Sequence, residues 1–182
     1  RSCSTNADFR WLIFTDLPAP DGTPVNVHIL PLTPAELEAR VSAMLETSFV
    51  LSRGYKLVDL KPAYGELFCD YLTDCDFWGY TDLDVIYGDL ARFFPTDILQ
   101  SHDVLSPSDR LLVGHLTLLR NTLDMCRLYR SCPGYKQILC RETHEGFDEK
   151  GFHQLVINLA QQQQLRVYLR DMKAEDIILR LT

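Results

Sequence analysis

The sequence lacks an excess of positive charge. Its 25 acidic side chains outnumber its 18 Lys and Arg side chains, which gives a net charge of −7, and the basic residues are scattered. Nucleic acids and anionic membranes both require a basic surface, so we expect neither as a partner. An apolar run long enough to span a bilayer and a recognisable signal peptide are also missing. We therefore expect a cytoplasmic protein without a transmembrane segment.

Paired cysteine motifs, repeats and linkers are absent as well. None of the six cysteines belongs to a CxxC pair, and no His stands at zinc-finger spacing. We expect reduced thiols, with Cys69 and Cys126 in helical stretches. Because no compositional break divides the chain, we expect a single domain over residues 1–182.

Apolar periodicity alternates between strand and helix along the chain. The pattern predicts strands over 9–16, 25–30, 77–89, 103–106, 111–119 and 166–170, and helices from 34, over 62–72, after Asn121 or Thr122, and over 148–163. Thr33 and Glu36 form a capping-box pattern around Pro34. This alternation predicts an α/β domain with a largely parallel sheet. The polar opening RSCSTNAD and the ending DIILRLT leave truncation at both ends as an open expectation.

The stretch FWGYTDLDVIYGD (77–89) carries two carboxylates within a predicted strand. On an extended segment Asp82 and Asp84 point to the same side, and Leu83 turns into the sheet. Two neighbouring carboxylates repel each other, and a hard cation such as Mg²⁺ or Mn²⁺ relieves that repulsion. Phosphate oxygens of a nucleotide can fill the remaining coordination positions.

Two carboxylates at this spacing also occur in proteins with different chemistry. A calcium EF-hand loop that started at Asp82 would need Gly and Glu where the chain has Tyr87 and Phe93, so a loop of that kind is excluded. A phosphohydrolase with Asp82 as its nucleophile stays an alternative. A pair of solvated carboxylates at a strand end is the structural alternative.

The segment GYKLVDLKPAYG (54–65) precedes this stretch and carries Lys56, Asp59 and Lys61. A lysine near a helix start can meet a phosphate as a point charge. Ordinary surface lysines are the structural alternative. The combination of this segment with Asp82 and Asp84 favours a functional site more than either feature does by itself.

Together, YKLVDLKPAYGELFCDYL, DFWGYTDLDVIYGDL and GHLTLLRNT resemble a family of small GT-A-type glycosyltransferases. Its members are mostly bacterial polysaccharide-biosynthesis proteins. LIFTD near the start and FDEKG near the end resemble further blocks of that family, so the similarity covers most of the chain in the same order. The resemblance implies a GT-A domain, which is a Rossmann-like nucleotide-diphosphosugar fold with a mostly parallel mixed sheet.

The resemblance also implies roles for individual residues. Asp84 would be the direct ligand of Mn²⁺ or Mg²⁺, and Asp82 would lie near the ribose and the cation. The other donor-side residues would be Asp16 and Asp59 at the nucleoside and Lys61 and Lys56 at the phosphates. The donor would be a nucleotide sugar, with a UDP-sugar favoured, and the acceptor a saccharide. His115 and Asn121 would lie toward the acceptor.

Catalysis would follow from the same assignment. The cation and Lys61 would stabilise the departing nucleoside diphosphate. An inverting enzyme needs a carboxylate base, for which Asp148 and Glu149 of FDEKG are the candidates. An acid at a helix start that serves only the helix dipole is the structural alternative for each. A non-catalytic nucleotide-sugar-binding or interaction domain stays a further alternative.

Overall fold

The computed structural model describes residues 2–110 and 112–170. The strands are β1 (Trp11–Thr15), β2 (Val27–Pro31), β3 (Phe77–Thr81), β4 (Val104–Ser106), β5 (Leu116–Arg120) and β6 (Val167–Leu169). The α-helices are α1 (Pro34–Leu45), α2 (Tyr64–Leu67), α3 (Leu90–Phe93), α4 (Thr96–Ser101), α5 (Leu123–Cys126), α6 (Tyr135–Cys140) and α7 (His153–Gln161). Tighter 3₁₀ turns form η1 (Gly54–Ala63), η2 (Cys69–Tyr71) and η3 (Leu128–Ser131), and a wider π-helical turn forms η4 (Asp148–Phe152).

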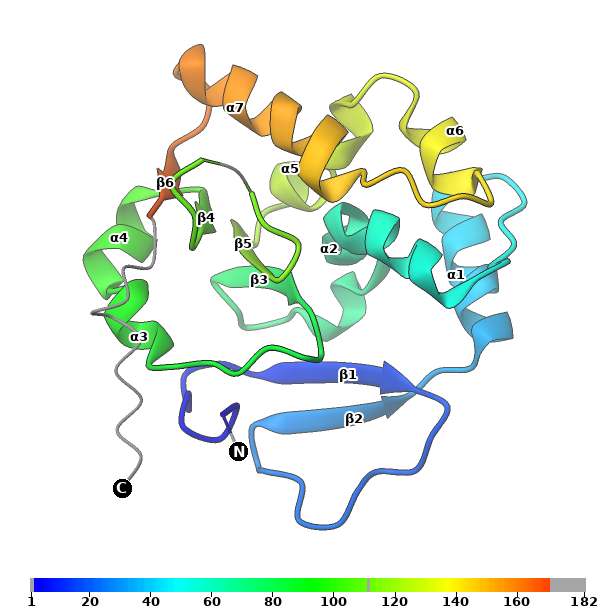
Figure 1. Ribbon diagram of the computed structural model, residues 1–182, viewed down its shortest axis with the longest axis horizontal. Helices are drawn as coiled ribbons and strands as arrows, with labels where there is room; N and C mark the ends of the chain where they lie inside the picture. Colours follow the sequence, from blue (N-terminus) through cyan, green and yellow to red (C-terminus); the bar gives the residue numbers. More distant parts are fainter. Residues whose placement is uncertain (1, 111, 171–182) are drawn as a thin grey trace.

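The strands form two sheets instead of the expected largely parallel one. In the larger sheet the order is β3-β5-β4-β6, where β5 runs antiparallel to both β3 and β4, and β6 runs parallel to β4. A separate parallel pair, β1 and β2, forms the lower part of the molecule in Figure 1. The α/β class and a mixed sheet are therefore confirmed, whereas the prediction that the sheet is mostly parallel was wrong. The alternation of strands and helices along the sequence does not determine which strands pair or in which direction. β3 and β5, for example, pair although they come from distant parts of the chain.

Two apolar clusters cover the two faces of the larger sheet. On one face Trp78, Leu119 and Val104 pack against α1, α2, α5 and α7. On the other face Leu105 and Leu118 pack against the segment that contains α3 and against side chains of β1. The larger sheet therefore lies between helices on one side and the α3 segment with the small sheet on the other (Figure 1).

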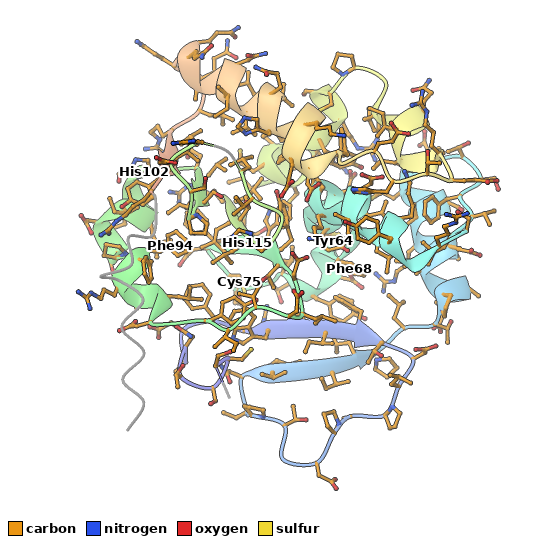
Figure 2. The ribbon with its side chains drawn as sticks, viewed as in Figure 1. Tyr64, Phe68, Cys75, Phe94, His102 and His115 are labelled. Carbon is orange, nitrogen blue, oxygen red and sulfur yellow. The ribbon has the colours of Figure 1, made fainter. Side chains whose placement is uncertain are left out.

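Aromatic contacts attach the small sheet to the rest of the molecule. The rings of Phe14 and Phe68 stack with their centroids 3.9 Å apart, and those of Trp11 and Tyr87 lie 4.5 Å apart. Figure 2 labels Phe68 between β1 and the helical segment that carries Tyr64. The start of β1 is thereby held close to the segment that follows β3, and its end is held close to the segment that precedes β3.

Two of the predicted helix starts, at Thr33 and at Thr122, are confirmed by their hydrogen bonds. The hydroxyl of Thr33 accepts from the Glu36 N–H at 3.3 Å, and the Glu36 carboxylate accepts from the Thr33 N–H at 2.8 Å. The hydroxyl of Thr122 accepts from the Met125 N–H at 3.3 Å, which makes Thr122 and not Asn121 the cap of α5. These caps satisfy N–H groups that a helix leaves unpaired.

The predicted helix over 62–72 is broken into short turns. Pro62 has no N–H group to donate, and the backbone around it adopts the tight turns of η1. At Gly65 a Cβ atom would lie 2.4 Å from Trp78 Cε2, so only glycine allows α2 to lie this close to β3. This close approach places the end of η1 beside the end of β3.

Several other boundaries differ from the sequence prediction. The strand expected over 111–119 begins at Leu116, and residue 111 lies outside the described residues. The ending DIILRLT also lies outside them. Among residues 2–110 and 112–170, no helix has the length and apolar character that a membrane span requires. All six cysteines are free thiols, as expected.

Asp103 holds β6 onto β4 through an ion-pair network. Its carboxylate lies 2.7 Å from Arg166 Nη2 and 3.3 Å from Arg120 Nε. The Arg166 side chain and backbone N–H, with help from Arg120, lower the pKa of Asp103 to about 2, although burial alone would raise it.

We expect this network to make the fold acid-sensitive. The folded pKa of Asp103 is depressed, so its stabilisation is present above pH 4 or so and is lost as pH falls toward 2. The Asp103→Asn variant should lose on the order of 1–2 kcal/mol at pH 7, allowing for screening at the exposed Arg166, and should show a flatter pH dependence between pH 4 and 2. Urea unfolding at several pH values measures both effects. The exposed Asp8→Asn is the control, and equal behaviour of the two variants would contradict this role.

Candidate functional site

A charged cluster lies just beyond the end of β3, around the ammonium group of Lys61. Lys61 comes from η1 and is 5% exposed. Its Nζ forms an ion pair with Asp82 Oδ1 and donates to the Gly114 carbonyl at 2.8 Å. The backbone N–H of Gly114 donates to Glu149 Oε1 at 3.1 Å. Three segments that are distant in sequence thus meet at one lysine.

Asp148 completes the cluster from the interior. It is 2% exposed, and its Oδ2 atom is buried without a hydrogen-bond partner. Burial raises the pKa of the Asp148 carboxyl; Lys61 opposes this rise and Glu149 adds to it. A buried carboxyl group with a raised pKa and a free oxygen takes up a proton more readily than an exposed carboxyl group does.

Gly114 provides the room for this arrangement. A Cβ atom at this position would lie 2.7 Å from Asp148 Oδ2 and 3.3 Å from Glu149 Oε1. Sequence reasoning placed His115 near the site but overlooked Gly114. The only sequence signal was its position directly before His115 in GHLTLLRNT.

Tyr80 and Tyr64 are further members that sequence reasoning missed. The Tyr80 hydroxyl is buried, and its pKa is raised first by burial and further by Asp148 and Glu149, although Thr117 opposes the rise. Burial also raises the pKa of Tyr64, and the charges of Asp148 and Asp82 add to that effect. Figure 2 labels Tyr64 in the middle of the molecule, with His115 nearby in this view. The period-two position of Tyr80 in FWGYTD, on the buried face of β3, was the available signal.

Asp82 and Asp84 do not lie on an extended strand, so the predicted geometry of this pair was wrong. β3 ends at Thr81, and residues 83 and 84 form a turn. Leu83, which we expected to face the sheet, is 86% exposed. Asp84 is exposed, whereas Asp82 is half-buried against Lys61. The strand ends here because its partner β5 begins opposite, at Leu116.

Lys56 and Asp59 form a buried ion pair. Their charged atoms are used in this pair and in bonds to the backbone, so they are not free to take part in the cluster around Lys61. Lys56 Nζ donates to Asp59 Oδ2 at 2.8 Å, to the Ile138 carbonyl at 2.7 Å and to the Thr143 carbonyl at 3.0 Å. These three bonds use all the donors of an ammonium group. Lys56 is therefore a clamp between η1 and the chain around α6.

Asp59 connects the same elements from its other side. Its oxygens accept from the N–H groups of Glu145 and Phe147, both at 2.9 Å, and lie 3.2 Å from His144 Nδ1. Burial alone would raise the pKa of Asp59, but Lys56 and the two N–H donors outweigh it and lower that pKa. The pair thus fixes η1, which carries Lys61, against the segment that leads to Asp148.

The remaining predicted site residues are divided between the two ends of β3. His115 is exposed beside the cluster, and its carbonyl accepts from the Thr81 hydroxyl at 2.7 Å. Asn121 lies at the opposite end, where its Nδ2 donates to the carbonyls of Leu72 and Cys75. Asp16 is exposed directly after β1. The structure therefore joins Lys61, Asp82, Asp148, Glu149 and His115, but not Asn121.

We expect the Asp59→Asn variant to be strongly destabilised. Removing the carboxylate charge leaves Lys56, which is 1% exposed, buried without its counter-ion. Breaking a buried pair in this way costs about 3–5 kcal/mol. Chemical denaturation measures the loss, and Asp70→Asn in the more exposed Arg40–Asp70 pair is the control, with an expected loss within about 1 kcal/mol. Similar losses in the two variants would show that the buried pair is no clamp.

The Asp148→Asn variant should behave in the opposite way. A carboxyl group whose folded pKa is raised destabilises the fold as pH rises from about 4 through that raised pKa. Removing the buried charge should leave the free energy of unfolding at pH 7 unchanged or higher by up to about 1 kcal/mol. Denaturation at pH 4 to 8 tests this, with Glu149→Gln as the neighbouring control. A clear loss of stability at pH 7 would contradict a charged, unpartnered Asp148.

Comparison with known proteins gives one match. The model of a family of unknown function, DUF6625, matches residues 1–181. No curated protein and no solved structure matches the chain. Since the family match covers nearly the whole sequence, this chain belongs to the DUF6625 family.

Proposed function

We propose that this protein is a metal-dependent glycosyltransferase that uses a nucleotide-sugar donor, with a UDP-sugar favoured, and a saccharide acceptor. The supporting observation is the convergence of Asp82, Asp148 and Glu149 on Lys61. These residues come from separate blocks of the sequence, and each block carries the resemblance to GT-A-type enzymes. Carboxylates beside a single lysine offer both a cation ligand and a proton acceptor within one cluster.

The residues fit a cation that arrives with the donor. No group of three or more His, Cys, Asp or Glu side chains within residues 2–110 and 112–170 is arranged to hold a metal ion. Mg²⁺ and its analogues commonly use one or two carboxylates and take their other ligands from phosphate and water. Asp84, which is exposed, would be the direct ligand, since Lys61 already neutralises one oxygen of Asp82. Once bound, the cation would neutralise charge on the departing diphosphate.

The chain's own residues would perform the other steps. Lys61 would donate to the diphosphate from its fixed position between Asp82 and Gly114. Asp148 is the better candidate base of the two acids, because its Oδ2 is free whereas a Glu149 oxygen already accepts from Gly114. In an inverting transfer Asp148 would take the proton of the acceptor hydroxyl as that oxygen bonds to the sugar carbon. The carbon–phosphate oxygen bond would break, and the nucleoside diphosphate would leave with its electron pair.

Donor binding should depend on both Mn²⁺ and Asp84. We expect one of the UDP-, GDP-, CMP- and dTDP-sugars to raise the melting temperature in the presence of Mn²⁺ and to have little effect without it. The Asp84→Asn variant should lose at least ~10-fold in Mn²⁺-dependent affinity, because a direct ligand is removed. Thermal-shift and calorimetric titrations measure both quantities.

The control is Asp21→Asn, since Asp21 is an exposed carboxylate in the loop between β1 and β2. Absence of any Mn²⁺-dependent stabilisation by all four donors would overturn the proposal. A phosphoryl group trapped on Asp82 after incubation with acetyl phosphate would instead favour the phosphohydrolase alternative. A folded protein that shows neither Mn²⁺-dependent donor binding nor a phosphoryl group on Asp82 would favour the remaining alternative, a non-catalytic interaction domain.

A further inference from the structure

A hollow lies outside the charged cluster, between α6 and residues 145–151. Its volume is about 460 Å³, within the range of small-ligand pockets. Figure 1 shows α6 and the segment leading into α7 on the same side of the molecule. The side chains that define its chemistry are Pro133, Gln137, Ile138, Arg141, Glu145 and Lys150.

Hydrogen-bond donors and acceptors alternate around this hollow. Arg141 Nη1 lies 3.3 Å from Glu145 Oε2, and Lys150 Nζ donates to the Glu145 carbonyl at 3.0 Å. Gln137 is exposed on α6 and adds an amide, which both donates and accepts. Pro133 and Ile138 contribute apolar surface between these groups. The hollow therefore offers planar polar groups beside an apolar wall.

This composition fits a sugar ring better than an anion or a nucleotide. The Glu145 carboxylate balances Arg141, and Lys150 already donates to the Glu145 carbonyl, so the two cations do not act together on an anion. A nucleoside base would require an exposed aromatic face, and the ring of Phe147 at the hollow is 1% exposed. Each sugar hydroxyl both donates and accepts, and the C–H face of a pyranose packs on apolar side chains. The polar side chains of the hollow can bond to such hydroxyls, and its apolar side chains can pack against such a C–H face.

The hollow and the charged cluster share one segment of chain. Phe147 and Gly151 line the hollow, while Asp148 and Glu149 contact the cluster around Lys61. Asp148 and Glu149 are not among the residues that line the hollow, so a sugar bound there is not the one whose hydroxyl Asp148 would deprotonate.

We propose that the hollow is a saccharide subsite that holds a unit of the acceptor other than the one receiving the new sugar. The role of the hollow as an acceptor subsite rests on the proposed transfer activity. Saccharide binding in the hollow requires neither donor nor cation. A failure of saccharide binding can therefore be distinguished from a failure of the proposed function.

The test is an NMR titration of the ¹⁵N-labelled protein without nucleotide or metal. The probes are methyl glucoside, methyl galactoside, N-acetylglucosamine and glucuronate at millimolar concentrations, with inorganic phosphate as the anion probe. We expect at least one saccharide to shift the amide signals of Gly134 and Gly151. The Gln137→Ala variant should bind it about 3–10-fold more weakly through loss of a hydrogen bond. Gln154→Ala on the exposed face of α7 is the matched control.

Each result decides the proposal. Saccharide-dependent shifts at Gly134 and Gly151 that weaken in Gln137→Ala but not in Gln154→Ala support it. Absence of shifts with every saccharide, or stronger shifts with phosphate than with any sugar, overturns it. Shifts from saccharides together with no Mn²⁺-dependent donor binding would retain the subsite and remove its acceptor role.

Discussion

The buried ion pair of Lys56 and Asp59 is the contact on which the charged cluster depends. Two charges that are 1% and 0% exposed are tolerated because each polar atom has a partner. Those partners are backbone groups of residues 138, 143, 145 and 147, so the pair joins η1 to the approach to η4. Lys61 lies on η1 and Asp148 on η4. The clamp therefore fixes the separation of the cation and the carboxylate.

The charges of the cluster are unbalanced, and the imbalance falls mainly on Asp148. Lys61 faces three carboxylates, from Asp82, Asp148 and Glu149, and it pairs directly with Asp82. Asp148 consequently bears the cost of burial, which appears as its raised pKa and its unpartnered oxygen. Such a group is stabilised by taking up a proton, whereas Asp82 is paired directly with Lys61. Two acids of the same cluster, Asp82 and Asp148, thus lie in different surroundings: one is paired with Lys61 and the other is buried with an unpartnered oxygen.

Local patterns predicted local structure, and tertiary pairing decided the remainder. The Thr33–Glu36 capping box and the strand preceding Asp82 were predictable because each depends on neighbouring residues. The turn at Asp84 was not, because β3 ends where β5 begins. The spacing of Lys56 and Asp59 is equally compatible with exposed and buried positions, and partners more than 80 residues away decide between them. Asn121 likewise has its partners at residues 72 and 75, a connection that no sequence pattern records.

The segment 145–151 is the element through which these features act together. Gly146 adopts a left-handed backbone conformation with φ of 68°, which turns the chain between Glu145 and Phe147 so that both N–H groups reach Asp59. At Gly151 a Cβ atom would lie 3.2 Å from the Phe147 ring, so the π-helical turn of η4 leaves little room for a side chain there. The segment consequently contributes Glu145, Phe147, Lys150 and Gly151 to the hollow and Asp148 and Glu149 to the charged cluster. A ligand that moves Lys150 would therefore act on the same short turn that holds Asp148.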